Sequence, residues 1–258
     1  MRHISFTTDY GLSDAFVAVC HGVALRAAPG VRIIDVTHLV PLADVRRGAS
    51  VLADAVPYLP EGTVHVGVVD PGVGTARRAI AAETAGGLFV GPDNGLLLPA
   101  ADALGGVTAA VELLDETTAR TFHGRDLFMP AAARLATGAR LAELGPAVDP
   151  GSLTRLAVFS TEAGEAWLET EVRSVDRFGS LQLAATATDL APLGSPVFLT
   201  DADQQPIVVP RGDTFGDVPP GELILLIDST GRAAISVNQG SAAERLGLGA
   251  GAVVRLES

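Results

Sequence analysis

The sequence contains no lysine, since all 18 of its basic residues are arginine. This absence excludes Schiff-base chemistry, a lysine-bound pyridoxal phosphate and the phosphate-loop lysine. A single cysteine, Cys20, cannot form an internal disulfide, so a cytoplasmic location is expected. No apolar run reaches the roughly 18–20 residues that span a membrane, and no cleavable signal is expected at the start.

Motifs for metal binding and for a serine nucleophile are also missing. The chain has no His-Glu-x-x-His, Cys-x-x-Cys or Gly-x-Ser-x-Gly pattern. Four histidines, His3, His21, His38 and His65, show no metal-ligand spacing. We therefore predict no metal ligands and no bound cofactor.

The charge balance is strongly acidic. The formal net charge is −12, which argues against a nucleic-acid partner because such proteins present a basic face to phosphates. An acidic field weakly favours a cationic ligand. The 258 residues, 48% of them hydrophobic, suffice for one large or two modest folded domains.

Strand and helix patterns alternate in the first part of the chain, residues 1–150. This alternation predicts an α/β domain with a mainly parallel sheet sandwiched by helices. The predicted strands are residues 4–8, 31–37, 63–69, 78–84, 88–90 and 110–114, and the predicted helices are residues 14–28, 44–56 and 126–137.

Short strands with turn signals dominate residues 165–258. They predict a smaller C-terminal antiparallel β-barrel domain, joined to the first by a linker over residues 151–164. The predicted strands are residues 166–175, 181–187, 195–200, 206–209, 222–227, 233–237 and 252–256, with a helical turn over 241–246.

Two loops follow predicted parallel strands, where open sheets bind ligands. The first contains Asp9 and Asp14, and the second contains Asp70 and Arg77. Local alternatives stand beside the functional interpretation: Asp14 is placed to cap the next helix, and Asp70 before Pro-Gly is a good turn former.

Further candidates lie in Phe122-His123-Gly124-Arg125-Asp126 and in loops of the barrel half. His123 is either a reactive imidazole or a structural hydrogen-bonding residue. Phe178 and Phe215 lie beside acids and small polar residues, and aromatic rings stack on purines. Each of these barrel loops could equally be an ordinary hairpin turn.

Five motifs in order resemble the S-adenosyl-L-methionine (SAM) hydroxide adenosyltransferase family, hydrolytic relatives of fluorinase and chlorinase. They cover nearly the whole chain. The motifs are Thr8-Asp9-Tyr10-Gly11 with Asp14, Val69-Asp70-Pro71-Gly72-Val73-Gly74-Thr75, Gly91-Pro92-Asp93-Asn94-Gly95, Phe122-His123-Gly124-Arg125-Asp126 and Asp176-Arg177-Phe178-Gly179.

The resemblance implies an enzyme that hydrolyses SAM to adenosine and L-methionine. It implies that Asp70, Arg77 and His123 form a triad that activates the water, and that Asp9 binds the ribose hydroxyls. It further implies a homotrimer with sites between subunits. The remaining implied substrate contacts are Asp14, Asp176 and Ser229 to methionine, and Phe178, Ser180, Phe215, Asn238 and Gln239 around adenine.

Departures from the halogenating relatives favour water over halide. In those relatives a tyrosine stands at the position of Asp70 and a serine at that of Gly124, and a loop is inserted between the segments matching Arg78 and Gly91. Ser180 replaces an asparagine, which weakens its adenine assignment, and Thr230 replaces an arginine that holds the methionine carboxylate. The alternatives are a halide-dependent adenosyltransferase, a non-catalytic adenosine or SAM binding module, and a metal-dependent hydrolase.

Overall fold

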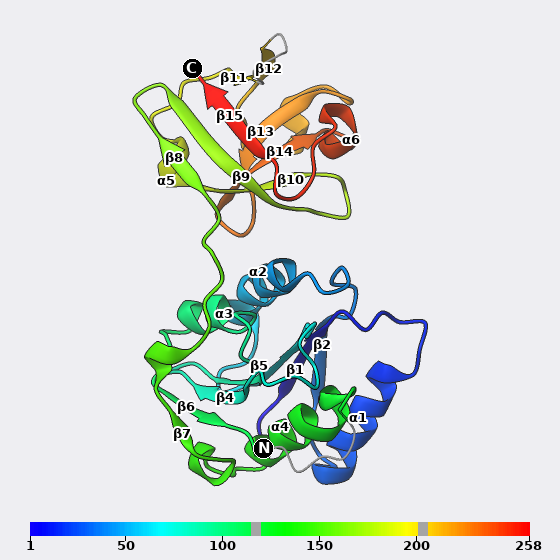
Figure 1. Cartoon of the computed structure of the whole chain (residues 1–258). Helices are drawn as coiled ribbons and strands as arrows, with labels where there is room; N and C mark the ends of the chain where they lie inside the picture. Colours follow the sequence, from blue (N-terminus) through cyan, green and yellow to red (C-terminus); the bar gives the residue numbers. More distant parts are fainter. Residues whose placement is uncertain (115–119, 201–205) are drawn as a thin grey trace. The chain divides into compact units, whose positions relative to one another are not determined.

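The computed structural model describes residues 1–114, 120–200 and 206–258. It divides into two compact units, Met1–Leu156 and Ala157–Ser258, and each has a hydrophobic core of its own (Figure 1). The first unit is mixed α/β and the second is a curved antiparallel sheet, in the order that the sequence predicts. Within the described ranges, no helix combines the length and the apolar character that crossing a membrane requires.

Seven strands of the described residues form the sheet of the first unit, in the order β2-β1-β3-β5-β4-β6-β7. The strands are β1 (Ile4–Thr8), β2 (Ile33–Thr37), β3 (Val64–Val68), β4 (Ala79–Glu83), β5 (Leu88–Pro92), β6 (Ala109–Glu112) and β7 (Ala147–Val148). Strands β2, β1, β3 and β5 are parallel, whereas β4, β6 and β7 extend the sheet in antiparallel pairs. Every residue of β1, β3 and β5 is buried, as expected for central strands covered on both faces.

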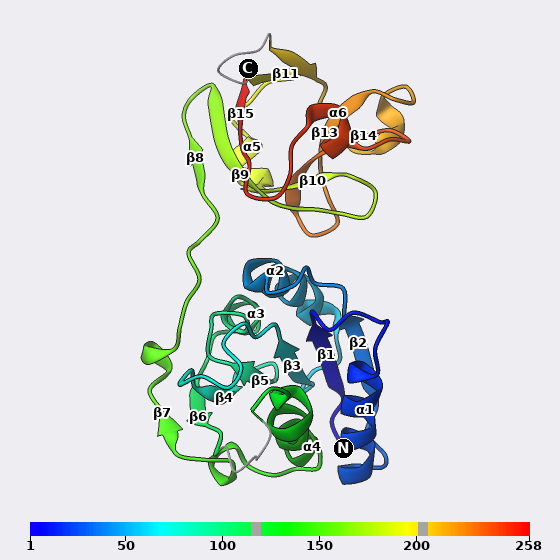
Figure 2. The same ribbon diagram turned by 45° about the vertical axis from the view of Figure 1, so that its right-hand side comes forward.

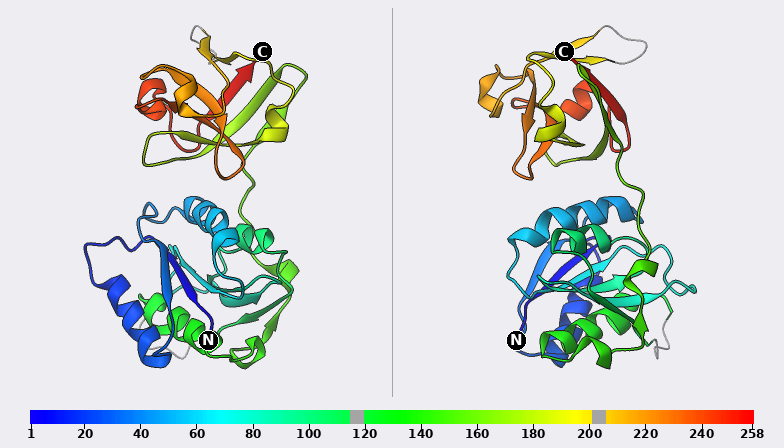
Figure 3. Two further views of the ribbon diagram at one scale, coloured as in Figure 1. Left: turned by 180° about the vertical axis from the view of Figure 1, so that it is seen from behind. Right: turned by 90° about the vertical axis from the view of Figure 1, so that its left-hand side faces the viewer.

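Two helical layers cover this sheet. Helices α1 (Phe16–Ala27) and α4 (Met129–Ala136) pack together on one face, and α2 (Val45–Ala55) and α3 (Leu98–Ala103) pack on the other. The right-hand view of Figure 3 shows the sheet between the two layers. The central parallel strands therefore end in loops that face the same edge of the sheet, where the candidate residues lie.

Two of the predicted helix starts differ in whether a side chain caps the helix. Asp44 caps α2, because its Oδ1 accepts a hydrogen bond of 2.9 Å from the backbone N–H of Arg47. Helix α1 instead begins at Phe16 after Ala15, and no side chain caps it. The alternative interpretation of Asp14 as a helix cap is therefore wrong.

The predicted helix over residues 126–137 begins as a π-helical turn, η2 (Gly124–Phe128), which continues into α4. His123 immediately precedes this turn. Such π turns are rare and occur frequently at functional sites.

The second unit consists of short strands around one core (Figure 2). The strands are β8 (Thr161–Ala163), β9 (Trp167–Val175), β10 (Leu181–Thr186), β11 (Val197–Thr200), β12 (Ile207–Val209), β13 (Leu223–Ile227), β14 (Arg232–Val237) and β15 (Val253–Glu257). Their order is β12-β11-β15-β9-β10-β14-β13, with β8 added to β9. A bridge between Arg211 and Leu225 joins the segment after β12 to β13, so the sheet nearly closes. Strand β8 lies within the segment for which we predicted a linker.

Candidate active site

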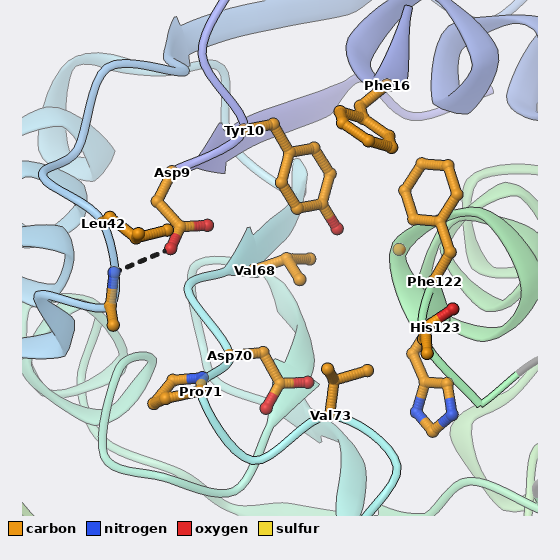
Figure 4. Close-up of a pocket in the computed structure, with 13 residues that line it drawn as sticks. Asp9, Tyr10, Phe16, Leu42, Val68, Asp70, Pro71, Val73, Phe122 and His123 are labelled. Atoms are coloured by element: carbon orange, nitrogen blue, oxygen red, sulfur yellow. Dashed lines mark hydrogen bonds between the residues drawn. The ribbon is translucent and has the colours of Figure 1, made fainter. Parts of the chain in front are cut away.

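A pocket of about 320 Å³ lies in the first unit beyond the ends of β1 and β3 (Figure 4). Its walls come from the loops after β1, β2 and β3, from the start of α1 and from the turn that leads into η2. The lining residues are Asp9, Tyr10, Phe16, Leu42, Ala43, Val68, Asp70, Pro71, Val73, Thr121, Phe122, His123 and Gly124. This is the edge of a parallel sheet at which ligands are expected to bind.

One chain of hydrogen bonds joins Asp70, Arg77 and His123. The Nε of Arg77 lies 3.1 Å from each carboxylate oxygen of Asp70, and its Nη2 lies 2.5 Å from Oδ2. The same Nη2 lies 2.8 Å from Nδ1 of His123. Asp70 and Arg77 lie in the loop between β3 and β4, whereas His123 precedes η2, so the fold brings together the three side chains that the resemblance groups.

The geometry assigns the protonation state of the imidazole. A guanidinium only donates hydrogen bonds, so Nδ1 of His123 must accept one and carry no proton. His123 is therefore neutral, with its proton on Nε2. The side chains of Asp70 and Arg77 are 5% and 12% exposed, so little water screens their attraction.

Hydrogen bonds of the Asn94 side chain hold the backbone at the start of the Asp70 loop. The Nδ2 of Asn94 donates a hydrogen bond of 2.8 Å to the carbonyl of Val69, and its Oδ1 accepts one from the N–H of Leu96. Farther along the loop, Gly74 has a φ of +75°, and a Cβ there would collide with the carbonyl of Arg120. Asn94 thus positions the residue next to Asp70, a role that the sequence motif alone does not reveal.

Asp9 reaches the pocket from the loop after β1. Its Oδ2 accepts a hydrogen bond of 2.9 Å from the N–H of Ala43, while its other oxygen points into the pocket (Figure 4). Asp14, in contrast, is exposed and is not among the residues that line the pocket.

Three aromatic rings form an apolar wall that the sequence interpretation missed. Tyr10, Phe16 and Phe122 contact one another with ring centroids 5.2–6.0 Å apart. Burial raises the pKa of Tyr10 above its usual range, so its hydroxyl remains protonated and can donate a hydrogen bond. Tyr10 and Phe122 lie inside the quoted motifs, and that adjacency was the available signal.

The polar candidates of the second unit are bonded mainly to their own loops. Asp176 Oδ1 accepts hydrogen bonds from the N–H groups of Phe178 and Ser180, at 2.8 and 2.9 Å. Asn238 Nδ2 donates to the carbonyl of Val218 at 2.7 Å. These contacts make Asp176 and Asn238 organisers of their turns.

The other candidates of the second unit differ in exposure. Phe178 and Phe215 are 79% and 51% exposed, which is unusual for large apolar rings. Ser229 is exposed, Ser180 is buried, and Gln239 has a φ of +58°. The two phenyl rings are therefore the candidates of this unit with the most surface available to a ligand.

One cluster of potential metal ligands forms among the described residues, and it lies outside the pocket. It consists of His21, Asp35 and His38, whose side-chain ligand atoms lie within 4.8 Å of one another. No short sequence motif links them, because they come from a helix, a strand and a loop.

Comparison with protein-family models gives two matches for this chain. Models of the SAM hydroxide adenosyltransferase N-terminal and C-terminal domains match residues 4–145 and 170–255. The chain belongs to the SAM hydroxide adenosyltransferase family. The resemblance inferred from the five motifs is thereby confirmed.

Within the SAM hydroxide adenosyltransferase family, similarity is greater to proteins named as hydrolases. The chain is 58% identical to the (R)-S-adenosyl-L-methionine hydrolase of Salinispora tropica, over 98% of this chain and 97% of that protein. It is 43% identical to the protein of that name from Thermus thermophilus, over 99% and 100%. A fluorinase of an Actinoplanes species is 29% identical over 97% and 96%.

Solved structures share the fold of this SAM hydroxide adenosyltransferase family member. A protein of Thermotoga maritima matches with a TM-score of 0.92 and 33% identity, over 99% of this chain and 100% of that one. A protein of Thermus thermophilus matches with a TM-score of 0.80 and 40% identity, over the same shares.

Proposed function

We propose that this protein hydrolyses SAM to adenosine and L-methionine, with a water molecule activated by Asp70, Arg77 and His123. The observation on which the proposal depends is the continuous hydrogen-bond chain of carboxylate, guanidinium and imidazole at the pocket. Family membership and the 58% identity to a protein named as the hydrolase supply the substrate.

The reaction is an in-line displacement at C5′ of the ribose. The water oxygen forms a bond to C5′ as the C5′–S bond breaks, and the sulfur keeps the electron pair. Methionine leaves as a neutral thioether, so no acid has to protonate it. The protein must hold the water opposite the sulfur and take up its proton, and alignment of this kind contributes up to about 7–11 kcal/mol.

Asp70 is the proton acceptor in this proposal. A carboxylate oxygen has more than one lone pair, so Asp70 can accept from water while it is bonded to Arg77. The Nδ1 lone pair of His123 is already occupied by Arg77, and its Nε2 carries the proton. His123 and Arg77 therefore orient the carboxylate and stabilise the developing hydroxide.

The proposed substrate contacts come from residues of both units. In this proposal Asp9 accepts hydrogen bonds from the ribose hydroxyls, and the rings of Tyr10, Phe16 and Phe122 exclude water from the reacting carbon. Neither the attack of water on C5′ nor the departure of methionine needs a metal or a redox cofactor. The remaining proposed contacts are Asp14, Asp176 and Ser229 to methionine, and Phe178, Ser180, Phe215, Asn238 and Gln239 to adenine.

The decisive experiment is chromatography of SAM after incubation with purified protein. Adenosine and methionine should appear in equal amounts. Intact SAM after long incubation with stoichiometric protein would indicate a binding module instead, and 5′-halo-adenosine in the presence of chloride or fluoride would indicate a halide-dependent enzyme.

Asp70→Asn tests the role of the carboxylate. It should lower kcat about 10²–10⁴-fold while SAM still binds, because proton transfer contributes about that much. Asp102→Asn is the matched control, since Asp102 forms a similar pair with Arg155 on the surface. Near-normal turnover of the Asp70 variant would exclude the proposed base.

We also propose that the protein acts as a homotrimer in which each site uses two copies of the chain. The exposed rings of Phe178 and Phe215 support this, because removing such apolar rings from water lowers the free energy. Mixed trimers of Asp70→Asn and Phe178→Ala chains should recover part of the activity that each variant lacks. A monomeric mass in solution, or no recovery, would contradict the shared site.

A further inference from the structure

We propose that His21, Asp35 and His38 bind a divalent transition-metal ion of the zinc class, at a site separate from the pocket. His21 lies in α1, Asp35 in the edge strand β2, and His38 just after that strand. Helix α1 and strand β2 lie side by side in Figures 1 and 2. The site would link helix α1 to the edge strand and to the loop that follows this strand.

Both imidazoles converge on one carboxylate oxygen. Nε2 of His21 lies 2.9 Å from Oδ1 of Asp35, and Nε2 of His38 lies 3.0 Å from the same atom. Two imidazole nitrogens and a carboxylate oxygen are the ligands that zinc prefers, whereas magnesium and calcium prefer oxygen alone. Distances of this size place the three ligands around a point that one ion can occupy after a small adjustment.

The buried histidine gives an independent reason. His38 is 4% exposed, yet its Nε2 forms no hydrogen bond of acceptable geometry despite the nearby oxygen. A buried polar nitrogen that lacks such a bond costs free energy, and a metal ion at this position would remove that cost. The contact with Asp35, as it stands, leaves Nε2 of His38 without a hydrogen bond.

The opposite ring nitrogen is held as a metal-ligating histidine requires. Nδ1 of His38 lies 2.8 Å from Oγ1 of Thr8, which fixes the ring and directs Nε2 toward Asp35. The carbonyl of His38 also accepts a hydrogen bond of 2.8 Å from the N–H of Gly11. The proposed ion is therefore coupled through His38 to the loop that carries Asp9.

Exposure at the site leaves room for the ion to enter. The side chains of His21 and Asp35 are 28% and 41% exposed, so two of the three ligands are open to solvent. Water would complete the coordination, as in sites with three protein ligands. The role that fits this position is stabilisation of the first unit, since a ligand that binds only the folded state shifts the unfolding equilibrium.

Isothermal titration of tag-free, chelator-treated protein with Zn²⁺ alone tests the site. We expect one ion per chain and a rise in Tm when zinc is added. His21→Gln and Asp35→Asn should weaken binding at least as much as the ~10–100-fold that loss of an outer-shell partner costs. Both residues are partly exposed, so these variants are expected to fold.

His3→Gln is the matched control, because it removes a histidine outside the cluster. It should leave both the stoichiometry and the zinc-induced rise in Tm unchanged. The absence of saturable zinc binding, or binding that is undiminished in His21→Gln and Asp35→Asn, would overturn the proposal. Neither outcome depends on SAM turnover, so the result is independent of the proposed function.

Discussion

Two candidate aspartates, Asp70 in the first unit and Asp176 in the second, have different hydrogen-bond partners. In the first unit, Asp70 is bonded by the side chain of Arg77 and through it to His123. In the second unit, Asp176 and Asp217 accept hydrogen bonds from backbone N–H groups of their own turns. These backbone bonds, from Thr214 and Asp213, lower the pKa of Asp217.

The difference separates two uses of one residue type. A carboxylate that is bonded by its own turn stabilises that turn, so its removal should change stability first. A carboxylate that is bonded by a side chain which also contacts a residue far along the chain depends on the tertiary fold, and its arrangement can serve a reaction. The predictions below test this distinction from the largest expected effect to the smallest.

The largest effect should come from separating the three linked side chains. Arg77→Met should lower kcat about 10²-fold or more, because it removes the group that holds both Asp70 and His123. Combined with Asp70→Asn, it should lose little more than the more damaging single change, since residues that act as a unit are not additive. Steady-state kinetics of the four proteins measure this; multiplicative losses would show that the residues act independently.

Acid should destabilise the first unit through His65. Burial lowers the pKa of His65 to about 4, and its Nδ1 lies 2.8 Å from Oγ of Ser5. Because the unfolded chain takes up this proton at about pH 6.5 and the folded unit does not, stability is complete above pH 6.5 and falls as the pH decreases toward 4. The loss should reach roughly 3 kcal/mol.

Urea unfolding of the native protein and of His65→Gln at several pH values measures this loss. The variant should show a smaller decrease in stability between neutral and acid pH. Trp167, the sole tryptophan, lies in β9 of the second unit, so its fluorescence should shift less with pH than the helical circular dichroism signal. Equal pH dependence of native protein and variant would contradict the assignment to His65.

A smaller effect is expected from a methyl group at Gly124. A Cβ there would collide with the hydroxyl oxygen of Tyr10. Gly124→Ala should therefore displace that ring and lower kcat/KM by about tenfold, since overpacking costs about 1–3 kcal/mol. Tyr10→Phe in the same chain should restore part of the activity, because it removes the oxygen.

Gly22→Ala is the control for this substitution. Gly22 lies inside α1 with no atom near the added Cβ, so the change should raise Tm and leave kcat/KM unaltered. If Gly124→Ala were equally harmless, the close contact with Tyr10 would have no effect on the pocket.

The smallest effect should come from Asp176, where the two units are compared most directly. Asp176→Ala should cost about 0.5–1.5 kcal/mol of stability, because the N–H groups of Phe178 and Ser180 lose their acceptor. Asp176→Asn keeps an oxygen and should recover most of it. A rise in KM without a change in Tm would instead favour contact with the methionine part.

The alternating pattern of the first half predicted the elements of the α/β unit well. Strand β1 coincides with the predicted strand over residues 4–8, and α2 begins at Val45 within the predicted helix over residues 44–56. The sheet is less parallel than predicted, because β4, β6 and β7 pair antiparallel, and pairing direction is a tertiary property. Strand β8 was missed because three residues are too few to show a period.

The candidate site shows the same division between local and tertiary information. Motif order predicted the group of Asp70, Arg77 and His123, since the loop of Asp70 and Arg77 and the segment of His123 each carry a recognisable motif. The aromatic wall and the cluster around Asp35 were not predicted, because Phe16 and His21 of α1 meet the other members only in the folded unit. Nothing in a linear pattern distinguishes Asp176, bonded to its own turn, from Asp70.

The side chain of Asn94 also bears on how the residue at position 70 can be replaced by another. It ties the carbonyl of Val69 to the segment after β5 without touching the side chain at position 70. The main chain there is consequently set during folding, before any substrate arrives. A different side chain can occupy position 70 on the same main chain, so the group that handles the attacking nucleophile can change while its support stays the same.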